Sequence, residues 1–165
     1  MREKFMQRAL ELARQSLQIP GALPYAAVVV RNNEIIGEGL NMALTNLDPT
    51  SHGEVEAIRA ACSRVGSTRL DGCDLYTTAE PCSMCVATMY IAGIKHLYYA
   101  SAAPESAAFL GRLAAIDTKY QRRLSSDELR CQIASPLADR QMPATQLLAD
   151  EVAELFNEFA KRAGA

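Results

Sequence analysis

Two short segments combine residue types that could bind a metal ion and move a proton. The first is His52-Gly53-Glu54, and the second is Pro81-Cys82-Ser83-Met84-Cys85. Imidazole and thiolate groups are ligands that Zn²⁺ prefers, and a catalytic zinc site uses three protein ligands and keeps a fourth position for water. The pattern therefore predicts a catalytic zinc site with His52, Cys82 and Cys85 as the metal ligands.

The spacing within each segment adds to this prediction. Cys82 and Cys85 are three residues apart, so at a helix N-terminus both sulfurs face the same way, and the helix dipole there favours thiolates. Glu54 lies two residues after His52, close enough to approach a zinc-bound water without ligating the metal. Zinc lowers the pKa of such a water to about 7, and a nearby carboxylate can take that proton and return it elsewhere. We therefore expect hydrolytic chemistry on an unsaturated carbon that bears an amine.

Hydrophobic periodicity and turn residues indicate the elements that would position these side chains. The predicted helices are residues 2–17, a segment that follows the start signal at 48–51 and ends before Gly66, then 81–92, 107–120 and 144–162. The predicted strands are residues 25–30, 35–40, 75–78, 94–100 and 129–133, and loops are expected at 41–48 and 136–143. Because the first two strands form a hairpin, we expect a three-layer α/β/α sandwich with a mixed five-stranded sheet. The length of 165 residues suggests a single domain over 1–165.

Composition narrows the classes of partner. The net charge is −2, which disfavours a nucleic-acid partner, because proteins that grip a phosphate backbone usually carry a basic surplus. No run of eighteen apolar residues is present, so no membrane-spanning helix is expected. The first residues lack the apolar stretch of a secretion signal, and a cytoplasmic protein is expected. Five cysteines in a reducing compartment indicate metal or thiol chemistry rather than a disulfide framework.

Other conspicuous residues are expected to be structural. Cys62, Cys73 and Cys131 are predicted to be small buried hydrophobes, and His96 to be a surface or structural residue near a strand start. The basic segment 119–123 is predicted to be a solvated helix face. Core positions are expected for the remaining aromatic residues and for the inner face of the last helix: Tyr90, Tyr98, Tyr99, Phe109, Leu147, Leu148, Val152, Leu155, Phe156 and Phe159.

A His-x-Glu segment followed by Pro-Cys-x-x-Cys is a signature of zinc-dependent nucleobase deaminases. With that signature, residues 23–100 resemble the cytidine-deaminase-like superfamily and are similar to bacterial guanine deaminases and their small-molecule relatives. The matching stretches read LPYAAVVV, GEGLNMALTNLDPTSHGEVEAIRAAC and LDGCDLYTTAEPCSMCVATMYIAGIKHLYYA. Residues after Ser101 match poorly, and these families keep much of their substrate specificity in that region.

The resemblance implies a role for each matching residue. His52, Cys82 and Cys85 correspond to the zinc ligands, and Glu54 corresponds to the proton shuttle. Four further residues correspond to substrate-binding positions: the Asn41 amide at the ring edge of the base, the Gly53 backbone N–H at a ring or carbonyl group, the Glu80 carbonyl at the leaving amine, and Tyr25 in the base pocket. The resemblance also implies a homodimer in which one subunit helps to close the pocket of the other.

This chain departs from the family pattern in two ways. Many relatives have alanine where this chain has Gly53, although glycine also occurs there in fungal-type cytosine deaminases. Guanine deaminases carry an acidic residue after the fourth strand and an aromatic residue near the C-terminus. The corresponding stretches here read PESAAFLGRL and AKRAGA and offer no counterpart.

The leading functional hypothesis is a zinc-dependent, guanine-deaminase-like enzyme that hydrolytically deaminates a free nucleobase or a related aminated heterocycle. The alternatives within the superfamily are a cytosine deaminase that acts on a pyrimidine base and a tRNA-specific adenosine deaminase. A third hypothesis, from another class, is a non-catalytic scaffold stabilised by zinc. That scaffold would have no use for Glu54 or for an open fourth metal position.

Overall fold

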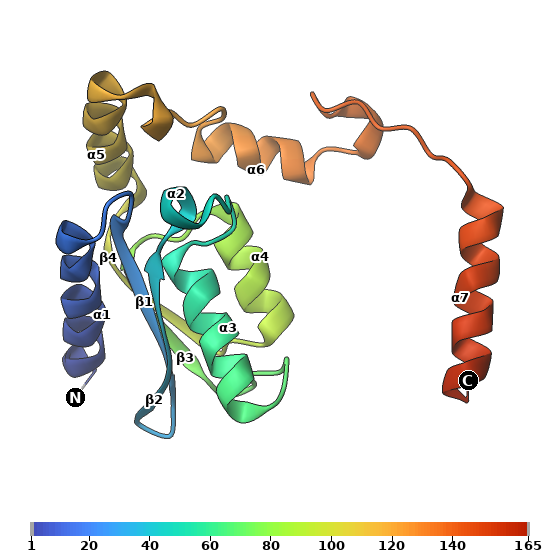
Figure 1. Cartoon of the computed structure of the whole chain (residues 1–165), viewed down its shortest axis with the longest axis horizontal. Helices are drawn as coiled ribbons and strands as arrows, with labels where there is room; N and C mark the ends of the chain where they lie inside the picture. The colour runs from blue at the N-terminus through green and yellow to red at the C-terminus, as the bar shows by residue number, and fades with distance from the viewer. Residues whose placement is uncertain (1, 165) are drawn as a thin grey trace. The chain divides into compact units, whose positions relative to one another are not determined.

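The computed structural model describes residues 2–164 of the chain. It contains two compact units, Met1–Ser126 and Asp127–Ala165, which are described separately. The first unit contains a four-stranded sheet and the helices that cover it (Figure 1). No helix in the described part of the chain combines the length and apolar character needed to cross a membrane.

The elements of the first unit alternate between helices and strands. In chain order they are α1 (Glu3–Gln15), η1 (Ser16–Gln18), β1 (Leu23–Arg31), β2 (Glu34–Asn41), α2 (Ala43–Asn46), α3 (Gly53–Val65), β3 (Asp74–Ala79), α4 (Ser83–Ala92), β4 (His96–Ser101), α5 (Ala103–Ile116) and η2 (Thr118–Tyr120). The predicted elements before residue 101 are all present. One short helix, α2, occupies part of the segment that was expected to be a loop.

The sheet has the strand order β2-β1-β3-β4. β1 pairs antiparallel with both β2 and β3, and β3 pairs parallel with β4. The β1–β2 turn holds Asn32 and Asn33 at φ values of 50° and 65°, which suits a tight hairpin because asparagine tolerates positive φ. The expected mixed sheet and hairpin are therefore confirmed.

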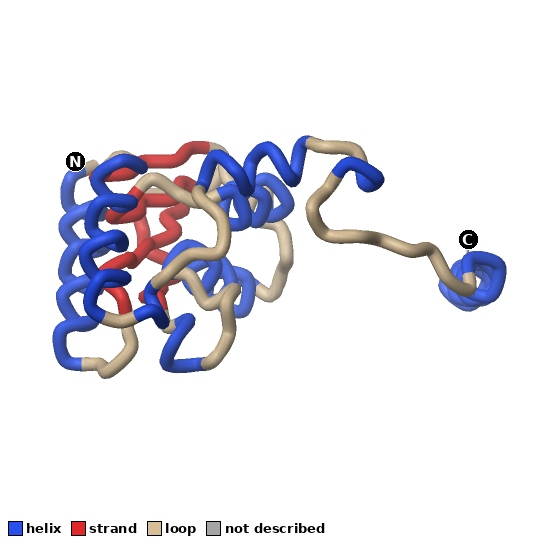
Figure 2. Tube along the Cα trace, turned by 90° about the horizontal axis from the view of Figure 1, so that it is seen from above, coloured by secondary structure: helices blue, strands red, loops and turns tan. Residues whose placement is uncertain are grey.

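Helices cover both faces of this sheet, so the predicted three-layer α/β/α sandwich is confirmed. α1 lies on one side and α3 and α4 lie on the other, with the strands between them (Figures 1 and 2). Successive residues of β1 point to opposite faces, so Ala27 and Val29 pack with α3 and α4, whereas Val28 and Val30 pack with α1. Two buried apolar layers thus hold the sheet between its helices.

The prediction of a fifth strand at residues 129–133 was wrong. This segment belongs to α6 (Ser126–Ala134), and the sheet in the described residues has four strands. The physical reason is local: Asp127 and Glu128 occupy the first helical turn, where carboxylates are favoured by the helix dipole. The following residues are mostly good helix formers, and Ile133 is the one β-branched residue among them.

The remaining elements of the second unit are η3 (Leu137–Asp139) and α7 (Ala149–Ala163). The predicted helix over 144–162 is present as α7, but it begins at Ala149 rather than at residue 144, and its predicted inner face is not buried. No described residue of α7 is buried, and Phe156 and Phe159 are 68% and 73% exposed. Apolar periodicity shows which residues share a helix face, but it does not supply a surface to cover that face.

Other expectations about burial have mixed outcomes. Tyr90 is exposed, although a core position was expected, and so is Tyr99. Cys73 is buried as expected, whereas Cys62 is half-buried and Cys131 is exposed. His96 is exposed and is the first residue of β4, as expected. Large apolar side chains thus remain on the surface of α4 as well as α7.

Close contact between α3 and β2 depends on two glycines, Gly37 and Gly39. A Cβ at Gly39 would overlap the carbonyl oxygen of Gly53 and the amide nitrogen of Ala57. A Cβ at Gly37 would overlap the carbonyl oxygen of Ala57 and lie 2.6 Å from the nitrogen of Ala61. Because these atoms belong to backbone, they cannot rotate away. The glycines therefore set how near α3, with His52 at its start, lies to the sheet.

We expect Gly39→Ala to destabilise the protein by about 1–3 kcal/mol, the usual cost of overpacking a close contact. It should also weaken zinc binding, because α3 must move away from the sheet. Gly111→Ala is the matched control: it lies within α5, and an added Cβ there meets no atom within 4 Å. That variant should be as stable as wild type or up to about 1 kcal/mol more stable. Urea unfolding measures both, and equal stabilities for the two variants would contradict the prediction.

Candidate metal centre and active site

The site residues predicted from the sequence lie at one end of the sheet. Leu23 at the start of β1 pairs with Asn41 at the end of β2, and Ala79 at the end of β3 pairs with Ser101 at the end of β4. Tyr25 lies two residues into β1 at this same end. The strand directions therefore bring segments distant in sequence to a common edge.

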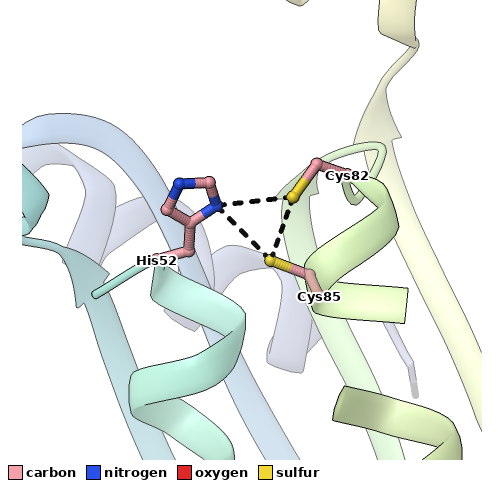
Figure 3. A group of neighbouring side chains, drawn as sticks. All are labelled: His52, Cys82 and Cys85. Atoms are coloured by element: carbon pink, nitrogen blue, oxygen red, sulfur yellow. Dashed lines mark hydrogen bonds between the residues drawn. The ribbon is translucent and has the colours of Figure 1, made fainter. Parts of the chain in front are cut away.

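The N-termini of two helices bring the three predicted metal ligands together at this edge (Figure 3). His52 is the N-cap of α3, and Cys82 is the N-cap of α4, with Cys85 in the first turn of α4. His52 Nδ1 lies 3.6 Å from Cys82 Sγ and 3.4 Å from Cys85 Sγ, and the two sulfurs are 3.6 Å apart. The three side chains thus form a compact triangle whose ligand atoms face one another.

This triangle has the dimensions of one face of a zinc coordination tetrahedron. Zn–S bonds of about 2.3 Å and a Zn–N bond of about 2.0 Å at tetrahedral angles place two sulfurs about 3.8 Å apart and nitrogen and sulfur about 3.5 Å apart. The separations of 3.6, 3.6 and 3.4 Å are each close to these values. Within the described residues, the group has three potential ligands. The donor set therefore fits zinc with one position left for another ligand.

Hydrogen bonding sets the charges of the ligands in the metal-free state. The hydrogen bond with Cys85 lowers the pKa of Cys82 to about 3, so this sulfur is a thiolate at neutral pH. The same hydrogen bond, together with burial, raises the pKa of Cys85. The hydrogen bond with Cys82 also raises the pKa of His52. Metal binding requires thiolates and a neutral imidazole, so it must displace the remaining protons.

Glu54 lies against this triangle from the first turn of α3. Its side chain is buried, with 5% of the residue exposed, and Oε2 lies 3.5 Å from Cys85 Sγ. Thr77 on β3 donates a hydrogen bond of 3.2 Å from Oγ1 to Glu54 Oε1. Burial raises the pKa of Glu54. The arrangement places one carboxylate oxygen beside the ligand group, suited to holding a proton there.

Asn41, Gly53 and Tyr25 lie at the same edge, in different surroundings. Asn41 is buried, and its Oδ1 accepts a hydrogen bond of 3.3 Å from the backbone N–H of Ala43. Gly53 packs directly on β1, because a Cβ there would lie 2.7 Å from the carbonyl oxygen of Tyr25 and 2.9 Å from Ala26 Cα. Gly53, at the position where many relatives have alanine, therefore allows the start of α3 to lie very close to β1.

The Tyr25 side chain packs on α5. Its ring meets Phe109 edge-on, with centroids 6.0 Å apart at 78°. Within the described residues, Tyr25 Oη and Ser106 Oγ of α5 are both buried, and they lie near each other without a hydrogen bond of good geometry to any partner. Burial raises the pKa of Tyr25, whereas the positive charge of Arg122 opposes that rise. A buried hydroxyl without a partner costs about 1–3 kcal/mol, so this wall suits a polar contact from a bound molecule.

Glu80 connects the segment that leads into Cys82 to the start of α5. Its backbone N–H donates 2.8 Å to the carbonyl of Ser101, and its Oε2 accepts a hydrogen bond of 2.9 Å from the N–H of Ala103, the first residue of α5. A carboxylate at a helix N-terminus is stabilising because of the free N–H groups and the dipole there. Glu80 therefore fixes the start of α5 beside the Cys82 segment.

Three further residues belong to this region, although no sequence pattern pointed to them as site residues. Thr77 bonds Glu54, Ser106 lies at the Tyr25 wall, and Arg122 is near enough to Tyr25 and His52 to influence the pKa of both. Arg122 was included in a basic segment expected to be a solvated helix face. Strand alternation could have found Thr77, because it is two residues before Ala79 at the end of β3 and shares its face.

Comparison with known proteins agrees with this geometry. The chain is 44% identical over 99 residues to a guanine deaminase of Bacillus subtilis, an alignment covering 60% of this chain and 64% of that relative. It is 39% identical over 107 residues to a tRNA-specific adenosine deaminase of Agrobacterium fabrum, covering 65% and 70% of the two chains. A solved structure of the B. subtilis guanine deaminase superposes with a TM-score of 0.80 at 33% identity and covers 96% of this chain and 93% of that one.

The N-terminal part of the chain carries the family match. Residues 1–101 match the family described as the cytidine and deoxycytidylate deaminase zinc-binding region. That range includes the His52, Cys82 and Cys85 triangle and all the elements from α1 to β4. The resemblance inferred from the motifs is therefore confirmed, and this chain belongs to the cytidine and deoxycytidylate deaminase zinc-binding family.

Proposed function

We propose that this protein is a zinc-dependent hydrolase that deaminates a free nucleobase or a related aminated heterocycle and releases ammonia. One observation carries the proposal: a triangle of His52, Cys82 and Cys85 with zinc dimensions lies against the buried carboxylate of Glu54. A purely structural zinc site usually has four protein ligands. A buried carboxylate beside a three-ligand group is the arrangement that hydrolysis requires.

In this proposal His52 Nδ1, Cys82 Sγ and Cys85 Sγ hold the zinc ion. The metal would supply a water molecule acidified enough to attack at neutral pH. Glu54 receives a proton at Oε2 and delivers it to a ring nitrogen next to the amine-bearing carbon. Glu54 then carries a second proton to the departing amine. The net reaction replaces the C–NH₂ group by C=O with consumption of one water and release of one ammonia.

Four residues would hold the base. The Asn41 side-chain amide contacts the ring edge, the Gly53 backbone N–H contacts a ring or carbonyl group, and the Glu80 carbonyl receives the leaving amine. Tyr25 closes one wall, where its ring already packs on Phe109. Guanine is the first substrate to test, since the B. subtilis guanine deaminase is similar over most of the chain by structure.

Ammonia release from a panel of heterocycles tests the proposal. Zinc-loaded protein would be incubated with guanine, adenine, cytosine, pterins and aminated triazines, with ammonia measured by a coupled enzyme. We expect turnover of at least one free base, with guanine preferred. Absence of ammonia from every compound would favour a zinc-stabilised scaffold. Turnover of cytosine alone would favour the cytosine deaminase alternative.

A tRNA-specific adenosine deaminase is the second candidate. A relative of that name from Aquifex aeolicus is 29% identical over 161 residues and aligns with 98% of this chain and 95% of its own length. The net charge of −2 favours the small base instead, because a polynucleotide partner usually needs a basic surplus. Conversion of adenosine to inosine in tRNA, with no turnover of free bases, would reverse this ranking.

We propose that the protein acts in the cytoplasm as a homodimer, with the whole 1–165 chain forming one deaminase domain. Exposed apolar side chains support the dimer: Tyr90 and Ile91 of α4 are 81% and 85% exposed, and α7 presents Leu155, Phe156 and Phe159 to solvent. Apolar groups gathered on a surface often mark an interface.

Light scattering tests the α4 part of this interface. We expect wild type to elute with the mass of a dimer, and Ile91→Lys to dissociate at least about 10-fold more readily, because a lysine charge must be desolvated at an apolar contact. Leu17→Lys is the control, since Leu17 is 79% exposed on η1. A monomeric wild type, or dissociation caused equally by both variants, would contradict the assignment.

A further inference from the structure

Thr77 is a fully buried polar side chain in the middle of the sheet. β3 pairs on both sides, so Thr77 lies between Ala27 of β1 and Tyr99 of β4. Its backbone is held by two neighbouring strands, and this fixes where its side chain starts. The face of β3 that Thr77 shares with Leu75 is the face packed against α3 and α4. The backbone of Thr77 therefore holds its side chain in a fixed position next to the start of α3.

The hydroxyl of Thr77 holds one specific oxygen of Glu54. It donates to Oε1 at 3.2 Å, whereas Oε2 lies 3.5 Å from Cys85 Sγ on the side of the ligand triangle. The two carboxylate oxygens thus have different environments. Oε1 is directed toward Thr77 in the sheet, and Oε2 is directed toward Cys85 in the triangle of predicted metal ligands.

Zinc binding makes the Thr77 contact more important. A cysteine has one S–H, which Cys85 cannot give to both Cys82 and Glu54, and a thiolate ligand has none. Of the side-chain hydrogen bonds of Glu54 to the described residues, the one from Thr77 does not involve a metal ligand. A buried carboxylate needs a donor to offset its desolvation. With Oε1 held in this way, Oε2 is the oxygen left to exchange protons with substrate.

We propose that Thr77 is a positioning residue that orients Glu54 for proton transfer. This inference rests on the proposed function, because it assigns Thr77 a role through Glu54. A merely structural threonine would fill space in the sheet, and valine has the same branched shape without the hydroxyl. A Thr77→Val protein that folds and binds zinc therefore distinguishes the two roles: it should stay active if Thr77 only fills space and lose activity if the hydroxyl orients Glu54.

The test compares Thr77→Val and Thr77→Ser as zinc-loaded full-length proteins, with guanine as the substrate. We expect Thr77→Val to lower kcat by about 10- to 100-fold, the usual effect of losing a group that orients an active-site residue. KM should stay within about two-fold and zinc content at one per chain. Thr77→Ser restores the hydroxyl and should recover kcat to within about three-fold of wild type. Unchanged kcat in Thr77→Val, or an equal loss in both variants, would overturn the proposal.

Thr78→Val is the matched control for loss of a neighbouring hydroxyl. Thr78 Oγ1 accepts a hydrogen bond of 3.0 Å from the N–H of Ala26 and donates 3.4 Å to the carbonyl of Pro24, so it contacts backbone rather than Glu54. This variant should lose stability but keep kcat. A loss of kcat equal to that of Thr77→Val would show that any hydroxyl in this dipeptide is needed, and would overturn the specific role of Thr77.

A double-mutant cycle in urea tests the contact without any substrate. Thr77→Val should change the unfolding constant strongly when Glu54 is present and much less in a Glu54→Met background, where no carboxylate awaits a donor. Independent effects of the two substitutions would overturn the proposal. Coupling in urea, together with no ammonia release by wild type, would leave Thr77–Glu54 positioning intact and refute the deaminase function instead.

Discussion

Replacement of Glu54 by glutamine is expected to lower kcat by about 10⁴-fold, the upper end of the range for a positioned proton-transfer group. The effect is large because Glu54 serves both the ring nitrogen and the departing amine in the proposed reaction. The glutamine amide cannot accept and return a proton, although it has nearly the same volume. Steady-state ammonia release measures the loss.

The same variant should keep its zinc and its fold. Glutamine still offers an oxygen to Thr77 and removes the cost of burying a carboxylate, whose pKa is raised by burial. Zinc content should therefore match wild type, and urea stability should be equal to or higher than that of wild type. Glu56→Gln is the control, because Glu56 lies on the same helix but bonds Arg59 at 2.7 Å, and it should retain full kcat. An active Glu54→Gln protein would contradict the mechanism.

Removal of zinc is expected to abolish activity and to lower Tm by about 10 °C. A metal present at about 1,000 times its Kd stabilises the folded state by about 4 kcal/mol, and 1 kcal/mol shifts Tm by about 2–4 °C for a chain of this size. Without the metal, the N-termini of α3 and α4 would be joined mainly by hydrogen bonds among His52, Cys82 and Cys85. Calorimetry before and after chelation measures the shift.

Thiol reactivity provides a second observation on zinc removal. In the metal-free state the pKa of Cys82 is lowered to about 3 by its hydrogen bond with Cys85, so Cys82 is a thiolate and should react rapidly with a disulfide reagent. Zinc should protect it. A Cys131→Ser background removes the exposed cysteine that would react in either state. Added zinc should restore both Tm and protection, whereas chelation without effect on either would contradict metal binding by this group.

Much of the site could be predicted because its chemistry is local in sequence. His52 and Glu54 are two residues apart, and Cys82 and Cys85 are three apart, so each pair is placed by the geometry of one helix start. The mixed sheet was likewise predictable, since an asparagine turn joins two β-rich segments into a hairpin. Such local patterns can be interpreted without knowledge of tertiary contacts.

Predictions failed where burial depends on a distant surface. The segment 129–133 contains apolar residues compatible with a strand. It forms part of α6 because it pairs with no strand of the sheet, so its local helix preference decides its structure. Phe156 and Phe159 have the spacing of a buried face and are exposed on α7. Periodicity determines which side chains lie together, and only the packing of other elements determines whether they are covered.

By itself, the sequence identified the zinc ligands and the acid–base residue to test, and it indicated the order of the elements up to residue 101 apart from the short helix α2. The tertiary structure alone decided how those parts meet. It brought His52 within 3.6 Å of two sulfurs about thirty residues away, and it set Thr77 against one oxygen of Glu54. These contacts depend on strand register and on the close approach permitted by Gly37 and Gly39. Such distances arise from packing, which no local pattern encodes.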